Sequence, residues 1–397
     1  MPWHGESPMM EKFAFVRDFQ RGLYTLSDLA AQYGVSRKTA HKWVKRFEEL
    51  GKAGLEDRPH SANEVANRTP KWVEEQVVEL RRLHRTWGAK KLLIALGKSL
   101  DVDLMPARST VADILKRHDL VNVKTRRRRE GHHGRPVAEP TAPNEIWGMD
   151  FKGQVRTGNG RYCYPFTVSD LYSRYLICCD GYLSTATEGV MKSLERVFQE
   201  YGMPLAIRSD NGAPFASTGI ARLTRLGVWL LKLGIRRELI LPGCPYQNGR
   251  HERMHRTMKF EAMHPPAQDL FRQHKRLQLF RIEFNEIRPH EALGMNTPAS
   301  VHTVSPRLFP AQLPEPQYPG AFEVRRVSRN GGIRWRGEWL PVGHALIEEN
   351  VGFEQIADGL WDVHFASLRI GRFDERTRRL VGTLGSHYRN GQRSDQP

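Results

Sequence analysis

Cysteine is scarce in this chain, with four among 397 residues: Cys163, Cys178, Cys179 and Cys244. Four are too few for a disulfide framework, and their spacing does not match a zinc site, so we expect reduced thiols. Long apolar runs are also missing. No stretch approaches the roughly 18 apolar residues of a membrane span, and the start of the chain lacks the apolar segment of a signal peptide. The sequence therefore predicts a cytoplasmic protein without a membrane partner.

Acidic residues are in the minority, since 44 Asp and Glu stand against 61 Lys and Arg, a formal net charge of +17. A positive field of this size raises the local concentration of polyanions, which favours nucleic acid as the partner. Composition alone fits equally well a soluble protein that is merely basic, so the placement of the charge must decide. The length suggests two or three domains with room for a sizeable core.

The segment from residue 25 to residue 47 has the pattern of a helix-turn-helix. Thr25 and Asp28 can form a capping pair at the start of one helix. Gly34 suits a left-handed turn, and Ser36 is a good N-cap for a second helix. The apolar and basic residues of that second helix separate onto opposite faces, and its basic face could enter a major groove. A solvated charged surface is the competing interpretation. The expected DNA contacts are Arg37, Lys38, His41, Lys42 and Lys45.

A second helix-turn-helix-like unit is predicted over residues 61–123. Thr69 and Pro70 are typical of an N-cap followed by proline at the first helical position. A further helix covers about residues 90–97, and Ser109 is expected to cap a third. Residues 124–143 form a basic linker that could lie along a phosphate backbone, although a basic run also suits a nuclear-import signal. Its expected DNA contacts are Arg126, Arg127, Arg128 and Arg129.

Residues 144–305 have the mixed pattern of an α/β domain. Residues 146–155, 162–170 and 174–182 predict three consecutive antiparallel strands, because each run is rich in β-formers and short turns separate them. Helices and strands then alternate, ending in two long helices between about residues 248 and 287. This order indicates a mixed sheet with helices on its faces.

The C-terminal part begins with a Pro-rich linker over residues 306–319. Apolar and polar positions then alternate, which predicts a small basic β-barrel over residues 320–385. Residues 386–397 are expected to be a disordered tail. Together with a first helix-turn-helix domain over residues 1–60, the sequence predicts a multidomain protein: all-α at the N-terminus, α/β in the centre and all-β at the C-terminus.

Two aspartates stand out from the acids that form ordinary turns. Asp150 lies inside an apolar strand, where a carboxylate needs a partner or a cation. Asp210 ends a later strand in a Ser-Asp-Asn-Gly string, which by itself suits a turn. Because ligands gather beyond the carboxyl ends of strands in an α/β sheet, neighbouring strands could bring Asp210 to Asp150.

Glu252 lies at the start of a helix and has basic residues at i+3, i+4 and i+7 on the same face. They are His255, Arg256 and Lys259. A surface stripe of salt bridges explains this row. A helix that presents a metal ligand and holds phosphates beside it explains the row as well.

Four strings occur in order along the chain: WGMDFKG, SDNGAPF, PGCPYQNGRHERMHRTMK and FNEIRPHEALGMNTP. Through them the sequence resembles the DDE transposases of bacterial insertion sequences, which are relatives of retroviral integrases. The resemblance covers nearly the whole chain and is strongest over residues 147–298. It implies a ribonuclease H-like catalytic core in which Asp150, Asp210 and Glu252 are the catalytic triad. It also implies that Arg256 and Lys259 hold DNA near the active site.

Two departures from the family pattern are visible. Between Asp210 and Glu252 stand 41 residues, where the family usually has roughly thirty-five. The excess is expected to lengthen residues 216–234. The zinc unit at the start of retroviral integrases is replaced by helix-turn-helix domains, which favours a transposase over the integrase of a retroelement.

Phosphodiesters carry negative charge and resist nucleophiles, and hard divalent cations bound by oxygen ligands neutralise that charge. We therefore expect two Mg²⁺ ions, with Mn²⁺ able to substitute, and no organic cofactor. Asp150 would bridge both ions, while Asp210 and Glu252 would each complete one site. Metal-activated water would free a 3′ hydroxyl at the element end, and that hydroxyl would attack target DNA.

The sequence thus predicts an insertion-sequence transposase that binds the terminal inverted repeats of its element, cleaves DNA and joins the ends to target DNA. Its partners would be double-stranded DNA and, because two ends must be paired, further copies of the chain. No small-molecule substrate is expected, and the location would be the bacterial nucleoid. One alternative is a sequence-specific DNA-binding regulator on an inactive or domesticated core, which the presence of all three acids disfavours. Another is a nuclease of the same fold, which the two N-terminal recognition units disfavour.

Overall fold

The computed structural model of the protein describes residues 7–57, 68–121, 139–241 and 244–383. The chain divides into two compact units, residues 1–68 and residues 69–397. The core of the first unit is built on Phe15, Leu29 and Trp43. Its elements are α1 (Pro8–Gln20), α2 (Leu26–Gln32), α3 (Arg37–Leu50) and the short 3-10 helix η1 (Gly51–Leu55).

The turn between α2 and α3 has the predicted chemistry. Thr25 and Asp28 form a capping box at the start of α2. The Ser36 hydroxyl accepts a hydrogen bond from the Thr39 amide at 3.2 Å, which caps α3. Gly34 has a φ of 63°, in the left-handed region that favours glycine. The helix-turn-helix expected from the sequence is therefore confirmed in its local structure.

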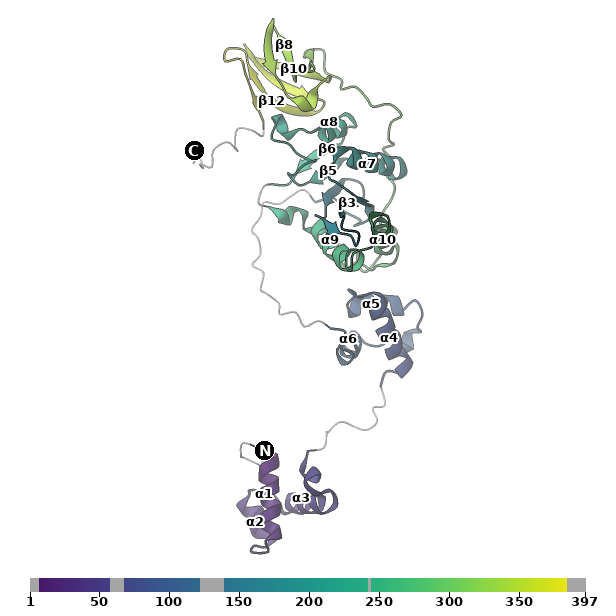
Figure 1. Ribbon diagram of the computed structural model, residues 1–397, viewed down its shortest axis with the longest axis vertical. Coiled ribbons are helices and arrows are strands. Elements are labelled where there is room, and N and C mark those ends of the chain that lie inside the picture. The colour runs from purple at the N-terminus through teal and green to yellow at the C-terminus, as the bar shows by residue number, and fades with distance from the viewer. Residues whose placement is uncertain (1–6, 58–67, 122–138, 242–243, 384–397) are drawn as a thin grey trace. The chain divides into compact units, whose positions relative to one another are not determined.

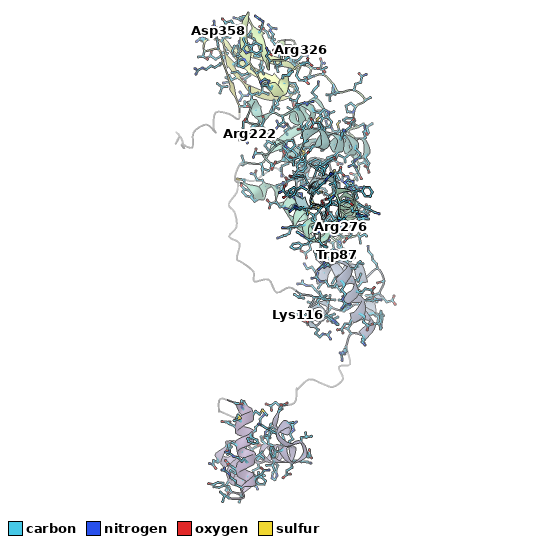
Figure 2. The ribbon with its side chains drawn as sticks, in the orientation of Figure 1. Trp87, Lys116, Arg222, Arg276, Arg326 and Asp358 are labelled. Atoms are coloured by element: carbon cyan, nitrogen blue, oxygen red, sulfur yellow. The ribbon has the colours of Figure 1, made fainter. Side chains whose placement is uncertain are left out.

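The second unit begins with three helices, α4 (Lys71–Leu83), α5 (Ala89–Leu96) and α6 (Arg108–Arg117). Trp87, labelled in Figure 2, is fully buried in their small core. Two predicted caps are wrong. Pro70 itself occupies the N-cap of α4, which leaves Thr69 outside the helix, and Ala107 occupies the N-cap of α6. At neither start does the N-cap side chain accept a hydrogen bond from the helix, because Pro70 and Ala107 have no side-chain acceptor.

The central sheet combines antiparallel and parallel strands. β1 pairs antiparallel with β3, and β3 pairs antiparallel with β4, as predicted. β5 lies parallel to β1, and β6 lies parallel to β5. The order of the described strands is β2-β3-β1-β5-β6, with β4 on the other side of β3. Their bounds are β1 (Ile146–Phe151), β2 (Val155–Arg156), β3 (Tyr162–Asp170), β4 (Leu176–Tyr182), β5 (Ala206–Ser209) and β6 (Arg236–Leu239).

Helices cover both faces of this sheet (Figure 1). α7 (Thr187–Tyr201) and α8 (Arg225–Lys232) pack on one face around Trp147 and Phe166. α9 (Gly249–Ala262) and α10 (Leu270–Ile282) pack on the other face through a cluster that contains Met258. The helix expected at about residues 220–233 is split. A short 3-10 helix, η3 (Ile220–Arg222), precedes α8, because Ala221 has a left-handed φ of 47°.

The remaining short helices are η2, η4 and η6 to η8, all of the 3-10 type, and η5, a π-helical turn that continues α10. Their bounds are η2 (Val102–Leu104), η4 (Pro245–Asn248), η5 (Glu283–Ile287), η6 (Glu291–Leu293), η7 (Pro298–Ser300) and η8 (His344–Leu346). None of the described helices is long and apolar enough to cross a lipid bilayer.

The C-terminal domain consists of antiparallel strands around an aromatic core of Trp335, Phe353, Trp361, Phe365 and Phe373. In place of one closed barrel, the strand pairs of the described residues form a sheet of order β13-β12-β11-β10-β7 and a separate β8-β9 hairpin. The bounds are β7 (Glu323–Arg326), β8 (Gly332–Trp335), β9 (Glu338–Pro341), β10 (Asn350–Ala357), β11 (Leu360–Phe365), β12 (Leu368–Asp374) and β13 (Arg379–Gly382). The predicted tail at residues 386–397 lies outside the described residues.

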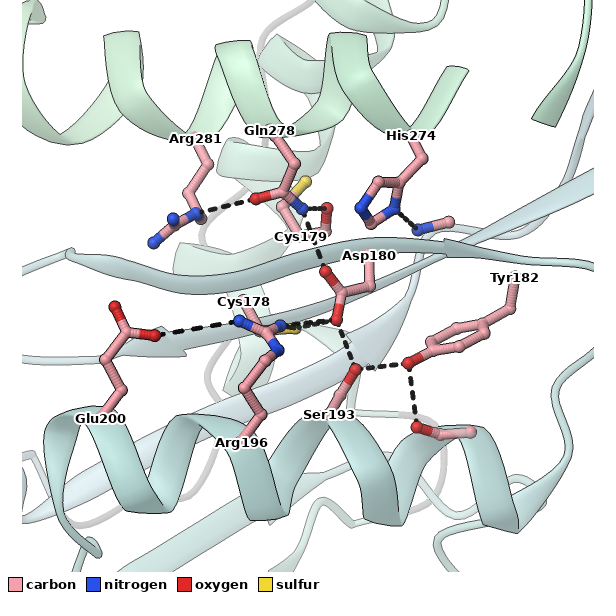
Figure 3. Close-up of polar contacts among 12 residues, drawn as sticks. Cys178, Cys179, Asp180, Tyr182, Ser193, Arg196, Glu200, His274, Gln278 and Arg281 are labelled. Carbon is pink, nitrogen blue, oxygen red and sulfur yellow. Dashed lines mark hydrogen bonds and ion pairs between the residues drawn. The ribbon is translucent and has the colours of Figure 1, made fainter. Parts of the chain in front are cut away.

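A buried polar cluster joins β4 to α7 and α10 (Figure 3). The Asp180 carboxylate accepts hydrogen bonds from the Ser193 hydroxyl, from Arg196 Nη2 at 2.8 Å and from Gln278 Nε2 at 3.0 Å. Burial by itself would raise the pKa of Asp180, but the bonds from Ser193 and Arg196 outweigh burial and leave that pKa below its ordinary value. The cluster holds two helices to the edge strand through one carboxylate.

This cluster makes the stability of the fold depend on pH. Because the pKa of Asp180 is lower in the folded state than in the unfolded chain, its contribution is present above the unfolded value of about 3.9 and is lost as the pH falls through the folded value. We expect Asp180→Asn to lower the free energy of unfolding at pH 7 by about 1–3 kcal/mol and to remove this acid-range dependence. Urea unfolding at several pH values measures both effects.

Glu200→Gln is the matched control. Glu200 lies 3.9 Å from the same arginine, and both side chains are about half exposed. An exposed pair of this kind contributes about 0–1 kcal/mol. Equal losses in the two variants would contradict the role given to Asp180.

Candidate active site

The two aspartates expected at the site lie at the carboxyl ends of adjacent parallel strands. Gly148 on β1 is in register with Arg208 on β5. Asp150 and Asp210 each follow two residues later, so the parallel pairing brings them to the same edge of the sheet. Burial and then the charge of Asp210 raise the pKa of Asp150 to about 7. The two carboxylates are therefore close enough to repel each other.

The loop after β5 holds Asp210 in place. The Gly212 amide donates a hydrogen bond to Asp210 Oδ1 at 3.1 Å, the local turn that the Ser-Asp-Asn-Gly string suggested. Asn211 Nδ2 donates to the Ile240 carbonyl at 2.6 Å, which ties this loop to the end of β6. Asp210 is thus both a turn former and a neighbour of Asp150.

Glu252 is exposed on the first turn of α9, which crosses close to β1. At Gly148 a Cβ atom would lie 2.9 Å from Leu171 Cδ2 and 3.1 Å from His251 Nδ1. Only glycine leaves room for the helix at this distance. The charge of Glu252 also raises the pKa of Asp150, more weakly than burial and Asp210 do. The three predicted acids therefore interact, although they come from three different elements.

His255 is not a DNA contact, which corrects the expectation from the sequence. It is buried on the inner face of α9, with 3% of its surface exposed. Its Nδ1 lies 3.7 Å from Asp150 Oδ2. The sequence correctly predicted that His255 lies on the same helix as Glu252, one turn later. It did not reveal that the sheet covers the side of the helix on which His255 lies.

Three further residues of this region were missed by sequence reasoning: Thr167, Ser169 and His251. All three are buried behind Asp150 and are joined by hydrogen bonds with His255. The spacing in the sequence could have indicated this group. His251 and His255 are four residues apart and share a helix face, and Thr167 and Ser169 are two apart and share a strand face. Burial lowers the pKa of His251 to about 3 and that of His255 well below its ordinary value, so both rings are neutral at pH 7.

The other expected DNA contacts have mixed outcomes. Arg256 and Lys259 are exposed on α9, next to Glu252. The predicted contacts on α3 are all exposed, opposite the buried Ala40, Trp43 and Val44. Arg126, Arg127, Arg128 and Arg129 lie outside the described residues.

The donor chemistry of Asp150, Asp210 and Glu252 suits a hard divalent cation, because carboxylate oxygens are the ligands that Mg²⁺ prefers. The pKa of Asp150 is raised first by burial and then by the charge of Asp210, and a cation would offset both effects. Among the described residues, no group of three or more His, Cys, Asp or Glu side chains is close enough to hold a metal ion. The residues fit such ions by chemistry and charge, and the side chains must draw together to bind them.

A positively charged cleft of about 1010 Å³ borders Glu252. Arg174 Nη1 and Arg250 Nη1 donate to the same carbonyl, that of Leu171, at 2.6 and 3.0 Å. Burial and then the charge of Arg250 lower the pKa of Arg174 to about 10. The anion beside these two guanidinium groups is the carboxylate of Glu139, which accepts a bond from Arg250 Nη2. The basic residues that line the cleft are Lys91, Arg174, Arg208, Arg250, Arg253, Arg256 and Arg288.

Comparison with family models assigns known domains to most of the described chain. Residues 140–245 and 233–298 match two models of the integrase core domain. Residues 11–62 match a helix-turn-helix domain, and residues 39–115 match a homeodomain-like domain. Residues 322–380 match the C-terminal domain of IS481 family transposases. The predicted layout of helix-turn-helix domains, integrase core and C-terminal β-structure is confirmed.

Two curated relatives come from bacterial insertion elements. The chain is 26% identical over 284 residues to the uncharacterized 39.2 kDa protein of IS476 from Xanthomonas euvesicatoria, covering 69% of this chain and 77% of that protein. It is 29% identical over 182 residues to the uncharacterized 31.7 kDa protein of IS407 from Burkholderia multivorans, covering 45% of this chain and 62% of that protein.

Two solved structures are similar at 16% identity. One is the catalytic core of HTLV-2 integrase in complex with magnesium, where the match covers 41% of this chain and 98% of that chain with a TM-score of 0.33. The other is a simian T-cell lymphotropic virus intasome in complex with the PP2A regulatory subunit B56 gamma, where the match covers 74% and 97% with a TM-score of 0.37.

The close approach of α9 to β1 makes Gly148 sensitive to a single methyl group. We expect Gly148→Ala to lower the free energy of unfolding by about 1–3 kcal/mol, because the new Cβ would overpack Leu171 and His251. Gly249→Ala, at the start of the same helix, is the control, since a Cβ there meets no atom within 4 Å. Urea unfolding of both variants measures the difference, and equal stability would show that α9 does not depend on this contact.

Proposed function

Because the chain is similar to the DDE transposases of bacterial insertion sequences in its integrase core and its DNA-binding domains, we propose that it is such a transposase. It binds the terminal inverted repeats of its element, cleaves DNA to free 3′ hydroxyl ends and joins them to target DNA. The observation that carries the proposal is the parallel register of β1 and β5, which brings Asp150 and Asp210 to one edge of an integrase core, where burial and then the charges of Asp210 and, more weakly, Glu252 raise the pKa of Asp150.

Asp150, Asp210 and Glu252 would hold two Mg²⁺ ions, which supply charge neutralisation and an activated nucleophile for phosphodiester chemistry. The remaining residues bind and orient DNA. Arg256 and Lys259 are exposed on the helix that carries Glu252, so they can hold phosphates of the scissile strand. The basic face of α3 reads the repeat sequence in a major groove.

Pairing two element ends requires more than one copy of the chain in the active complex. The cleft beside Glu252 supports a DNA path that continues past the active site, because seven Lys and Arg side chains against four Asp and Glu side chains line it, which leaves a surplus of positive charge. The protein would then act on double-stranded DNA both at the element end and at the target.

The first test follows strand joining on labelled repeat-end duplexes with Mg²⁺. We expect Asp150→Asn, Asp210→Asn and Glu252→Gln each to reduce joining by more than about 100-fold, because loss of one oxygen ligand removes several kcal/mol of charge stabilisation. Glu286→Gln, an exposed acid of the same core, serves as the control. Joining that survives a triad substitution would overturn the assignment of that residue. Repeat binding without any cleavage by the unaltered chain would favour the regulator instead.

The second test concerns the cleft and measures DNA binding alone, without cleavage or joining. In the presence of a chelator, we expect Arg253→Gln to weaken duplex binding and to reduce the slope of log affinity against log salt by about 1, because one phosphate contact is lost. Arg272→Gln, on an exposed arginine of α10 that pairs with Asp269, is the control. Fluorescence anisotropy at several salt concentrations gives both slopes. An unchanged slope for Arg253→Gln would remove this cleft from the DNA path.

A further inference from the structure

A buried chain of polar groups runs behind Asp150 between β3 and α9. The Thr167 hydroxyl lies 2.7 Å from His251 Nε2 and 2.7 Å from His255 Nε2. The Ser169 hydroxyl lies 2.9 Å from His251 Nδ1. At the other end of the chain, His255 Nδ1 lies 3.7 Å from Asp150 Oδ2. The four residues behind Asp150, which are Thr167, Ser169, His251 and His255, are nearly inaccessible to solvent, with exposed fractions of 0–5%.

The number of hydrogens that these four side chains can donate limits the directions in which their hydrogen bonds can run. A neutral imidazole has one N–H donor and one acceptor nitrogen, and a threonine hydroxyl has one hydrogen. Thr167 therefore cannot donate to both histidines, and at least one ring must donate its Nε2 proton to the Thr167 oxygen. The tautomers of His251 and His255 are thus coupled through a single hydroxyl group.

The Thr167 hydroxyl has three possible acceptors. The choice of acceptor decides whether His255 presents a lone pair or an N–H group to Asp150. If Thr167 donates to His251, or to the Asp150 carbonyl 3.1 Å away, His255 must carry its proton on Nε2. Its Nδ1 lone pair would then face Asp150 Oδ2, which is repulsive when Asp150 is ionised, the form that a metal ligand must have. If Thr167 donates to His255 Nε2, the proton of His255 is on Nδ1 and points towards the carboxylate.

We propose that His255 is a positioning residue whose Nδ1–H faces Asp150, and that Ser169, His251 and Thr167 fix this tautomer. Hydrogen bonds then run in one direction. Ser169 donates to His251 Nδ1, His251 Nε2 donates to Thr167, and Thr167 donates to His255 Nε2. The distance from His255 to Asp150 is longer than a hydrogen bond, so the N–H acts as an oriented dipole until the carboxylate turns towards it.

The proposal rests on the proposed function only in making Asp150 a metal ligand. An N–H dipole behind the carboxylate stabilises its anionic form beside Asp210, and it sets the direction of the oxygen that remains for a cation. The hydrogen bonds of Thr167 and Ser169 to the two histidines also join β3 to α9, so they link the helix that carries Glu252 to the sheet that carries Asp150. Groups of this kind, one layer behind metal ligands, typically change metal affinity by about 10- to 100-fold.

The primary test reads the tautomers directly, in the unaltered full-length protein without divalent cations, at about pH 9, above the pKa of about 7 of Asp150, so that this carboxyl group is ionised. Two-bond ¹H–¹⁵N correlation spectra of ¹⁵N-histidine-labelled protein distinguish protonated from bare ring nitrogens. Spectra of His251→Gln and His255→Gln assign the two rings among the 16 histidines. We expect Nδ1–H on His255 and Nε2–H on His251. An Nε2–H form of His255 would overturn the proposal, whatever the activity of the protein.

The second test uses conservative pairs and Mn²⁺ as the probe. Thr167→Val removes the hydroxyl at nearly constant volume, and Thr167→Ser keeps it. We expect calorimetry to show about 10- to 100-fold weaker Mn²⁺ binding in Thr167→Val and near-normal binding in Thr167→Ser. DNA affinity in the presence of a chelator should be unchanged in both. Unaltered Mn²⁺ affinity in a folded Thr167→Val variant would contradict the positioning role.

The outcomes separate this inference from the proposed function. If Asp150→Asn retains strand joining, the catalytic assignment fails. The histidine spectra still decide which ring nitrogens of His251 and His255 carry the protons. If strand joining needs Asp150 but His255 carries Nε2–H, the transposase proposal stands and the positioning role fails.

Discussion

Repulsion between carboxylates held at one sheet edge is the constraint on which the central domain depends. Asp150 and Asp210 end neighbouring parallel strands, and Glu252 is brought beside them by a helix that lies close to β1. Burial and then the charges of Asp210 and Glu252 raise the pKa of Asp150, so the fold itself holds an unfavourable arrangement in place. Rigid elements make this possible: paired strands, the Gly212 bond to Asp210 and the close approach at Gly148. A bound cation would convert the same repulsion into attraction.

α9 has three distinct surfaces, and this explains why so much of the site lies on one helix. Its first turn carries Glu252, its outer surface exposes Arg256 and Lys259, and its inner surface buries His251 and His255. Further along, Met254 and Met258 pack into the cluster beneath α10. Because a helix moves as one body, any shift in its packing displaces the acid, the basic row and the histidine chain together. Packing of the inner surface therefore sets the geometry of the outer one.

Local chemistry made the first helix pair and the central strands predictable from the sequence. A capping box, a glycine turn and alternating apolar runs leave little choice of structure. The start of α4 at Lys71 and the break at Ala221 were not predictable, because they depend on neighbours far along the chain. The same holds for His255, since the direction of a helix face follows from packing. The acids could be named from motifs, whereas the contact between Thr167 and His251 required the packing of a strand against a helix, between residues 84 positions apart in the sequence.

The long interval between Asp210 and Glu252 has a structural reason. It contains η3 and α8, and the outer surface of α8 is buried by the C-terminal domain through Val228 and Leu231. Lys232, with 7% of its side chain exposed, bonds Glu315 of the Pro-rich linker and Glu349 of the C-terminal domain, both at 3.0 Å. A buried cation with two acidic partners fixes this junction, because Lys232 would be left as an unpaired charge in the interior if the junction separated from both glutamates. The interval between the two acids therefore carries contacts that attach the C-terminal domain to the core.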